Sequence, residues 1–204
     1  MKRMVCVLLL ALALPVVAFA NNGTDFTNSG GTLSGTSAGL TLTGSTLIAV
    51  NNLGNMGLVT GNNLGGVYFT TGALTSGSLQ TGGIFAAGGA FQITGDGANG
   101  VPNTMIFNGS FSGPVTWTMV QLANGTHNYT LSGTLTGMWY TGATEDGATV
   151  QITINSGKGF FNGSTTISSG DTNMVSAVPE PGTLTLLGTG LVGLAGVLRR
   201  KLKT

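Results

Sequence analysis

Residues 115–136, VTWTMVQLANGTHNYTLSGTLT, decide the fold class. In the first half, Val115, Trp117 and Met119 alternate with Thr116, Thr118 and Val120. This period of two is typical of a half-buried β-strand. Asn124 and Gly125 follow, a dipeptide that supplies the positive φ angles of a tight turn. Because residues 128–136 then return with similar alternation, we predict a β-hairpin.

The rest of the chain between residues 21 and 177 follows the same pattern. Further short alternating segments lie at residues 40–43, 67–70, 91–94, 104–107 and 148–154. Threonine and aromatic residues are frequent in them, and such side chains suit a pleated, half-buried surface. Further turns are predicted at Asp96-Gly97, Asp146-Gly147 and Asn162-Gly163. We therefore predict an all-β domain, with order predicted less strongly over residues 30–66, which are glycine-rich and lack aromatic residues.

Two architectures fit this pattern. An antiparallel β-sandwich is favoured because the spacing between glycine-rich turns drifts, whereas the alternative, a β-solenoid, requires a fixed repeat. The aromatic residues are expected to form the core: Trp117, Trp139, Tyr129, Phe91, Phe107, Phe111, Phe160 and Phe161. Adjacent strand residues point to opposite faces, so one member of the pair Trp139 and Tyr140 should face outward. If the domain has a sugar-binding face, this pair is its candidate.

Composition excludes several classes of protein. The 204 residues include 36 glycines, and glycine inside a helix costs about 1 kcal/mol relative to alanine, which argues against a helical bundle. Only 6% of the residues are charged, and residues 21–178 contain five carboxylates against Lys158, a net charge of −4. We therefore expect no nucleic-acid partner, because such binding needs a basic surface.

Residues 1–20 have the three parts of a secretory signal peptide. Lys2 and Arg3 precede an apolar stretch, and Ala18 and Ala20 form a small-x-small cleavage site for signal peptidase. We expect an N-terminal signal helix, cleavage after Ala20 and export of the remaining chain. The single cysteine, Cys6, lies in the part removed, so no disulfide is expected in the mature protein.

The C-terminal segment, residues 178–204, has three parts in sequence. Pro179, Glu180 and Pro181 precede an apolar run at residues 183–198, which is followed by Arg199, Arg200, Lys201 and Lys203. A helix of sixteen residues is about 24 Å long, short of the hydrocarbon core of about 30 Å, but snorkelling of the arginines can cover the difference. We predict a transmembrane helix whose basic tail stays cytoplasmic.

This segment resembles the PEP-CTERM sorting signal. The resemblance implies that the chain is the substrate of an exosortase, a membrane transpeptidase of Gram-negative bacteria that make exopolysaccharide. An intermediate anchored in the inner membrane would be cleaved near residues 179–181, leaving the protein at the cell surface or outside the cell. We expect a structural or adhesive role in an exopolysaccharide or biofilm matrix; the alternative is a polysaccharide- or ice-binding module. Ice binding would require a flat, regular array of threonines, and the sequence has only isolated pairs: Thr41-x-Thr43, Thr116-x-Thr118 and Thr134-x-Thr136.

Two sequence motifs suggest enzymes but lack the required context. Residues 35–39 match G-x-S-x-G around Ser37, with Asp96 and His127 following, but the nucleophile elbow requires a strand-turn-helix and nothing near Ser37 is helical. His127 is expected to be an exposed structural residue beside the turn at Asn124 and Gly125. Residues 188–193 match a dinucleotide fingerprint, but they lie inside the C-terminal apolar run, where no βαβ unit can follow.

The remaining polar residues suggest only weak sites. Asp96, Asn99 and Asp171 could supply oxygen ligands to Ca²⁺, but without the spacing of an EF-hand. Paired carboxylates for glycoside hydrolysis would have to come from Asp25, Asp96, Glu145, Asp146 and Asp171. Glu145 and Asp146 are expected in a solvated turn. We therefore expect no enzyme activity, cofactor or metal ion.

Overall fold

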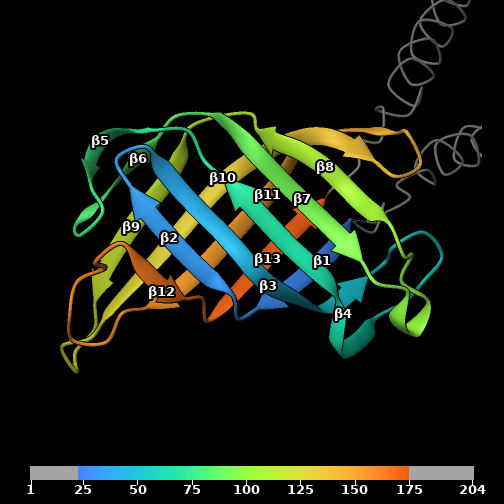
Figure 1. The fold of residues 1–204 in the computed structure, drawn as a ribbon, viewed down its shortest axis with the longest axis horizontal. Helices are drawn as coiled ribbons and strands as arrows, with labels where there is room; N and C mark the ends of the chain where they lie inside the picture. Colours follow the sequence, from blue (N-terminus) through green and yellow to red (C-terminus); the bar gives the residue numbers. More distant parts are fainter. Residues whose placement is uncertain (1–22, 175–204) are drawn as a thin grey trace, which may run out of the picture.

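The computed structural model describes residues 23–174, which form an all-β domain, as predicted (Figure 1). A 3-10 helix, η1 at Ala98–Gly100, interrupts the strands. The thirteen strands are β1 (Thr24–Ser29), β2 (Thr32–Thr36), β3 (Gly39–Asn51), β4 (Val59–Thr70), β5 (Leu74–Ser78), β6 (Gly82–Phe85), β7 (Gly88–Gly95), β8 (Met105–Phe111), β9 (Val115–Gln121), β10 (His127–Trp139), β11 (Thr144–Asn155), β12 (Ser164–Thr166) and β13 (Ser169–Met174).

Eight of the strands close into an antiparallel barrel. Their order is β11-β13-β1-β3-β4-β7-β8-β10, and the pairing of β10 with β11 joins the two ends of this path. The first and last strands are neighbours, because β1 pairs with β13 and Thr24 lies opposite Met174. The chain therefore enters and leaves the barrel at the same end.

Two long strands change neighbours along their length. Strand β10 pairs with β9 over residues 127–132 and with β8 over residues 135–139. Strand β3 pairs with β2 over residues 39–43 and with β1 over residues 46–51. At these two points the sheet of the barrel divides into two branches. One side branch consists of β2 and β12, and the other consists of β9, β6 and β5.

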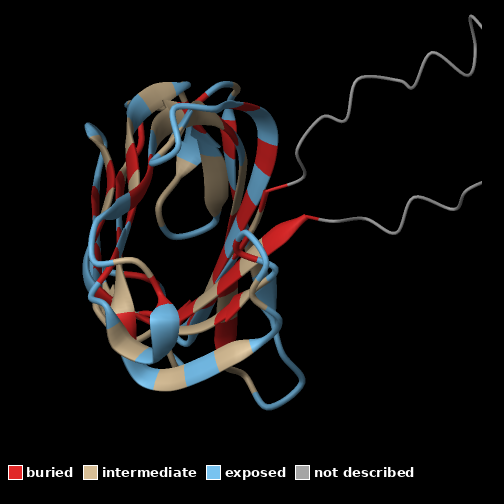
Figure 2. Ribbon diagram, turned by 90° about the vertical axis from the view of Figure 1, so that its right-hand side faces the viewer, coloured by how far each residue is buried: buried red, intermediate tan, exposed pale blue. Residues whose placement is uncertain are grey.

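Buried and exposed residues alternate along the strands, as Figure 2 shows. The inward-facing side chains fill the barrel. One aromatic group contains Phe69, Phe91, Phe107 and Phe111, with neighbouring ring centroids 5.9–6.3 Å apart. In a second group, Trp117 stacks on Tyr129 at 5.0 Å. Eight strands enclose a space that side chains can fill, so these rings form a packed core.

Most of the predicted core residues are buried, but two differ. Trp117, Tyr129, Phe91, Phe107, Phe111 and Phe161 are at most 2% exposed. Trp139 is only partly buried, against this core. Phe160 is 51% exposed, so its assignment to the core was wrong. It covers His127 from outside, with ring centroids 4.5 Å apart.

The predicted hairpin is present, whereas one predicted turn is a bulge. Strands β9 and β10 pair from Gln121 opposite His127 to Thr116 opposite Ser132, and Gly125 in the turn has φ +80°. Residues 146–147, predicted as a turn, lie inside β11, where the register shifts and Gly147 has φ +89°. An extra residue with positive φ bends a strand without reversing it.

The sandwich expected from the sequence is wrong, and so is the solenoid alternative. The pairings are antiparallel and the sheet closes on itself. A sandwich and a barrel share the same alternation of inward and outward residues, and they differ in which distant strands pair. The pairing of β1 with β13, the first strand with the last, makes the difference here.

The two helices predicted at the ends of the chain lie outside the described residues. This applies to the signal helix in residues 1–20 and to the transmembrane helix at residues 183–198. Within residues 23–174, no helix is long and apolar enough to cross a membrane.

Candidate functional site

The outward residues of β9, β10, β11, β13 and β1 form a surface of hydroxyl, amide and carboxyl groups, here called the outer polar face. Strands lie about 4.8 Å apart, and every second residue of a strand faces the same way. The strand registers therefore align these side chains in three rows. The rows are Thr118, Thr130, Thr153 and Ser169; then Thr116, Ser132, Gln151, Asp171 and Thr27; then Thr134, Thr149, Asn173 and Asp25.

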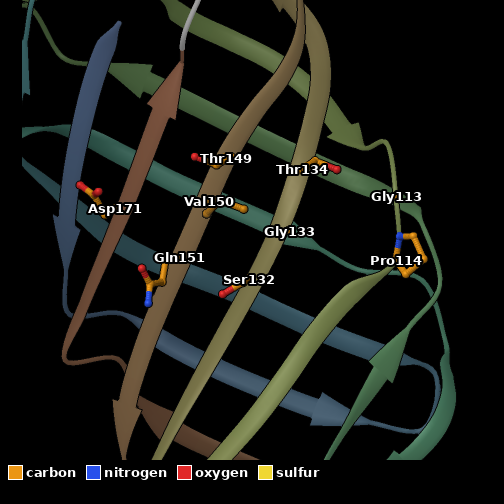
Figure 3. Close-up of a pocket in the computed structure, with 9 residues that line it drawn as sticks. All are labelled: Gly113, Pro114, Ser132, Gly133, Thr134, Thr149, Val150, Gln151 and Asp171. Atoms are coloured by element: carbon orange, nitrogen blue, oxygen red, sulfur yellow. The ribbon is translucent and has the colours of Figure 1, made fainter. Parts of the chain in front are cut away.

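A depression of about 440 Å³ lies in this face at the fork between β8 and β9 (Figure 3). Gly133 stands where β10 exchanges one neighbour for the other. The connection through Gly113 and Pro114 forms one border, and Gln151 and Asp171 lie on β11 and β13 on the other side (Figure 3). Ser112 ties the connection to β10, since its backbone N–H donates to the Thr134 carbonyl at 3.0 Å.

Asp171 is close to a second carboxylate, Asp25. Antiparallel pairing of β1 with β13 places Thr27 opposite Asp171 and Asp25 opposite Asn173, so the two acids are diagonal neighbours on the outer face. Burial raises the pKa of Asp25, and the Asp171 carboxyl raises it further by charge repulsion and by a hydrogen bond to it. The Asp25 Oδ1 atom is buried and accepts no hydrogen bond from the described residues.

The chemistry of this face is hydrogen bonding with little charge. Thr134, Thr149, Ser132 and Gln151 offer hydroxyl and amide groups around the depression. The described residues contain five carboxylates and one lysine, a net charge of −4. Such a surface suits neutral hydroxylated molecules better than anionic ones, because an anion would meet like charge at Asp171.

The residues of the hypothetical hydrolase triad are not assembled. Ser37 is exposed in the turn between β2 and β3, and Asp96 follows β7, at the opposite end of the barrel from the start of β10. Asp96 instead accepts hydrogen bonds from Asn63 and from the backbone of Ala98. His127 is 5% exposed, so the expectation of an exposed residue was wrong, and its Nδ1 has no partner within the described barrel.

The candidate calcium ligands are also apart. Asp96 and Asn99 share the connection between β7 and β8, whereas Asp171 lies on β13, which does not pair with either strand. Within residues 23–174 there is no group of three or more His, Cys, Asp or Glu side chains that could hold a metal ion.

Glu145 differs from the sequence expectation. It is 2% exposed, and its Oε2 accepts a hydrogen bond from the Trp139 indole N–H at 2.9 Å, whereas Asp146 is exposed as expected. The bulge in β11 explains the difference, because one extra residue reverses which side chains face the barrel interior. The prediction for the adjacent aromatic pair is confirmed, since Tyr140 is 47% exposed and Trp139 packs on Phe26 and Phe107.

The sequence analysis did not predict that Asp25 and Asp171 are neighbours. The two residues are far apart along the chain, and only the pairing of the first strand with the last brings them together.

The predicted processing residues lie outside the described residues: Ala18 and Ala20 at the signal cleavage site, Pro179, Glu180 and Pro181, and the basic tail Arg199, Arg200, Lys201 and Lys203.

Comparison with known proteins identifies the C-terminal segment. The family model of the PEP-CTERM protein-sorting motif matches residues 177–201, which confirms the resemblance of this segment. The motif implies an exported protein that is sorted by an exosortase. No curated protein matches the chain in sequence, and no solved structure matches it.

Proposed function

We propose that the β-barrel is a non-enzymatic structural or adhesive protein of the cell surface or extracellular matrix, where it binds exopolysaccharide. The single observation that carries this proposal is the outer polar face, with its rows of hydroxyl and amide groups around a depression. A polysaccharide presents a repeating series of hydroxyl groups, and aligned donors and acceptors on neighbouring strands can bond to several of them at once. Many weak contacts then add up along a polymer.

The route to the surface follows from the two ends of the chain. In this proposal, signal peptidase cuts after Ala20, the apolar segment at residues 183–198 holds an intermediate in the inner membrane, and the basic tail keeps that end cytoplasmic. The exosortase then cuts near Pro179, Glu180 and Pro181 and releases the barrel from its anchor.

Ice binding is the weaker alternative. One row of the outer polar face, Thr118, Thr130 and Thr153, resembles the regular threonine array that ice would require. The neighbouring rows mix serine, glutamine, asparagine and aspartate. Adjacent strands are also rotated by roughly 20–25°, so an array over five strands is not flat.

Co-sedimentation with polysaccharide purified from the matrix of the producing bacterium tests the proposal. The full-length chain is used in a detergent without a sugar headgroup. We expect binding, and we expect the double variant Thr149→Val and Gln151→Ala to weaken it. The matched control is Thr43→Val on β3, which lies across the barrel from β10. A wild-type chain that stays in the supernatant at every polysaccharide concentration would contradict the proposal.

A further inference from the structure

A second depression lies at the end of the barrel where the described chain begins and ends. It measures about 190 Å³, and its lining includes Thr24, Leu53, Trp139, Tyr140 and Thr141. We call these five residues the aromatic pocket. Part of its lining comes from the turn between β10 and β11, which lies on the right of Figure 1.

The Trp139 ring is fixed from behind. It packs on Phe26 and Phe107, each with its ring centroid 6.1 Å away. The backbone beside it is also held, because the Trp139 N–H donates to Ala143 and its carbonyl accepts from Gly142 in a tight turn. Because the ring is already ordered, a ligand that stacks on it does not have to immobilise it.

The hydrogen bond to Glu145 makes Trp139 a better stacking surface. Glu145 is buried, and its Oε2 accepts the indole N–H at 2.9 Å. A hydrogen bond from the indole N–H to a carboxyl oxygen draws electron density into the ring. The negative face of an aromatic ring attracts positively polarised C–H groups, so this contact strengthens such stacking. Glu145 is thus a positioning residue behind the pocket.

The lining selects the chemical class of the ligand. No charged side chain is part of the pocket's lining in the described structure, whereas the depression in the outer polar face includes Asp171. Trp139 and Tyr140 offer aromatic surface, and Thr24, Tyr140 and Thr141 offer hydroxyl groups. This combination matches a neutral sugar ring, which has one face of C–H groups and an edge of hydroxyls.

We propose that the aromatic pocket binds a single neutral pyranose ring of a polysaccharide. The inference rests on the proposed polysaccharide role of the domain and assigns part of that contact to Trp139 and Tyr140. The outer polar face then contacts the polymer along its length, and the aromatic pocket provides the stacking contact that the face lacks.

Intrinsic tryptophan fluorescence reports on this pocket directly. The chain has two tryptophans, and Trp117 is 2% exposed in the core, so a ligand-dependent change comes from Trp139. The full-length chain, in a detergent without a sugar headgroup, is titrated with hexasaccharides of β-linked glucose and of N-acetylglucosamine. We expect a saturable change with at least one of them. Trp139→Phe lacks this reporter, so its binding is measured by isothermal titration calorimetry, and we expect it to be weaker than that of the wild type.

Two further variants separate binding from folding. Tyr140→Ala, at an exposed position, should weaken the affinity about tenfold or more, as for an aromatic contact residue. Its matched control is Tyr68→Ala, an exposed tyrosine on β4, which should bind as the wild type does. Glu145→Ala should weaken binding, and Glu145→Gln, which keeps an acceptor for the indole, should restore most of it.

The outcomes distinguish the pocket from the domain's general role. If Tyr140→Ala and Trp139→Phe bind matrix polysaccharide and both hexasaccharides as tightly as the wild type, the assignment to the aromatic pocket is wrong, and the proposed function stands. If the wild-type chain binds the matrix polysaccharide but neither hexasaccharide, the pocket does not hold a neutral pyranose of these two types and the inference fails. If the wild type binds none of the three, the proposed function itself is wrong.

Discussion

Asp25 and Asp171 are diagonal neighbours across the strand pair that joins the beginning of the barrel to its end. Strands β1 and β13 hold the two termini of the barrel together, and the pair of acids lies on the outer surface of this join. Burial raises the pKa of Asp25 most, and the neighbouring Asp171 carboxyl raises it further, because two carboxylates repel each other when both are charged.

Replacing Asp171 by Asn should stabilise the barrel near neutral pH. Asp25 has a raised pKa in the folded state, so the folded state binds this proton more tightly than the unfolded chain does. The stabilisation of the folded state by protonated Asp25 is therefore complete below about pH 3.9, the pKa of an aspartate in the unfolded chain. It is lost as the pH rises through the higher pKa that Asp25 has in the folded state. Asp171→Asn removes the like charge, and we expect a gain on the order of 0.5 kcal/mol at pH 7.

Urea unfolding at pH 7 and at pH 4 measures this effect. The wild-type chain should gain stability relative to Asp171→Asn as the pH falls between these values. Asp146→Asn, which removes an exposed carboxylate at the bulge of β11, is the control and should keep the wild-type pH dependence. An unchanged pH dependence in Asp171→Asn would show that the two carboxylates are not coupled.

Two glycines with similar φ angles allow two contributions to the free energy of unfolding to be measured separately. One is the strain of a left-handed backbone conformation, and the other is the steric overlap of an added Cβ atom with its neighbours. Gly30 has φ +67° with no atom near the position of a Cβ, whereas at Gly89, with φ +71°, a Cβ would overlap the Thr70 carbonyl oxygen. Gly30→Ala should cost about 1–2 kcal/mol from the left-handed conformation alone. Gly89→Ala should cost about 1–3 kcal/mol more, because the strand pair of β4 and β7 must open to admit the methyl group.

The free energy of unfolding in urea compares the two variants directly. Gly44→Ala, at φ +66° and also in open space, should behave as Gly30→Ala does. Equal losses at positions 30 and 89 would mean that β4 and β7 are not held as closely as the structure has them.

The local features of the fold were predictable, because their causes lie within a few residues. Alternation and the Asn124-Gly125 turn define the hairpin of β9 and β10, and six of the eight proposed core aromatics are at most 2% exposed. Barrel closure was not predictable, since it depends on pairing between β1 and β13, and no local pattern encodes a partner so far along the chain.

The site was harder to predict than the fold. Trp139 and Tyr140 were recognisable as a pair facing opposite sides, because strand geometry alone requires it. The buried position of Glu145 could not be recognised. The bulge in β11 shifts the alternation of inward and outward side chains by one residue, and the sequence Glu145-Asp146-Gly147 is typical of a solvent-exposed turn. Similarly, Asp25 and Asp171 meet only through the closure of the barrel.

Removing the Tyr129 hydroxyl should destabilise the barrel. This hydroxyl donates to the Gln80 carbonyl at 2.7 Å and accepts from the Phe161 N–H at 3.0 Å, so it joins the turn after β5 to the segment before β12. Tyr129→Phe leaves both backbone groups without this partner, and we expect a loss of about 1–3 kcal/mol in the free energy of unfolding.

Tyr68→Phe is the matched control for this measurement. The Tyr68 side chain is 36% exposed, and removing its hydroxyl should change the free energy of unfolding by less than about 0.5 kcal/mol. If Tyr129→Phe unfolds at the same urea concentration as Tyr68→Phe, the hydroxyl does not join the two segments in solution.

Sorting should depend on the residues before the C-terminal apolar run. Because the matched motif includes Pro179, Glu180 and Pro181, replacing both prolines by Ala should leave the chain uncut and in the membrane fraction. Val178→Ala, one residue earlier, is the control and should be processed as the wild type is. Intact mass spectrometry of membrane and shed fractions checks this: the wild-type product should begin at Asn21 and end near residues 179–181. Shed wild-type protein that still extends to Thr204, or a shed double variant of normal mass, would contradict cleavage at this motif.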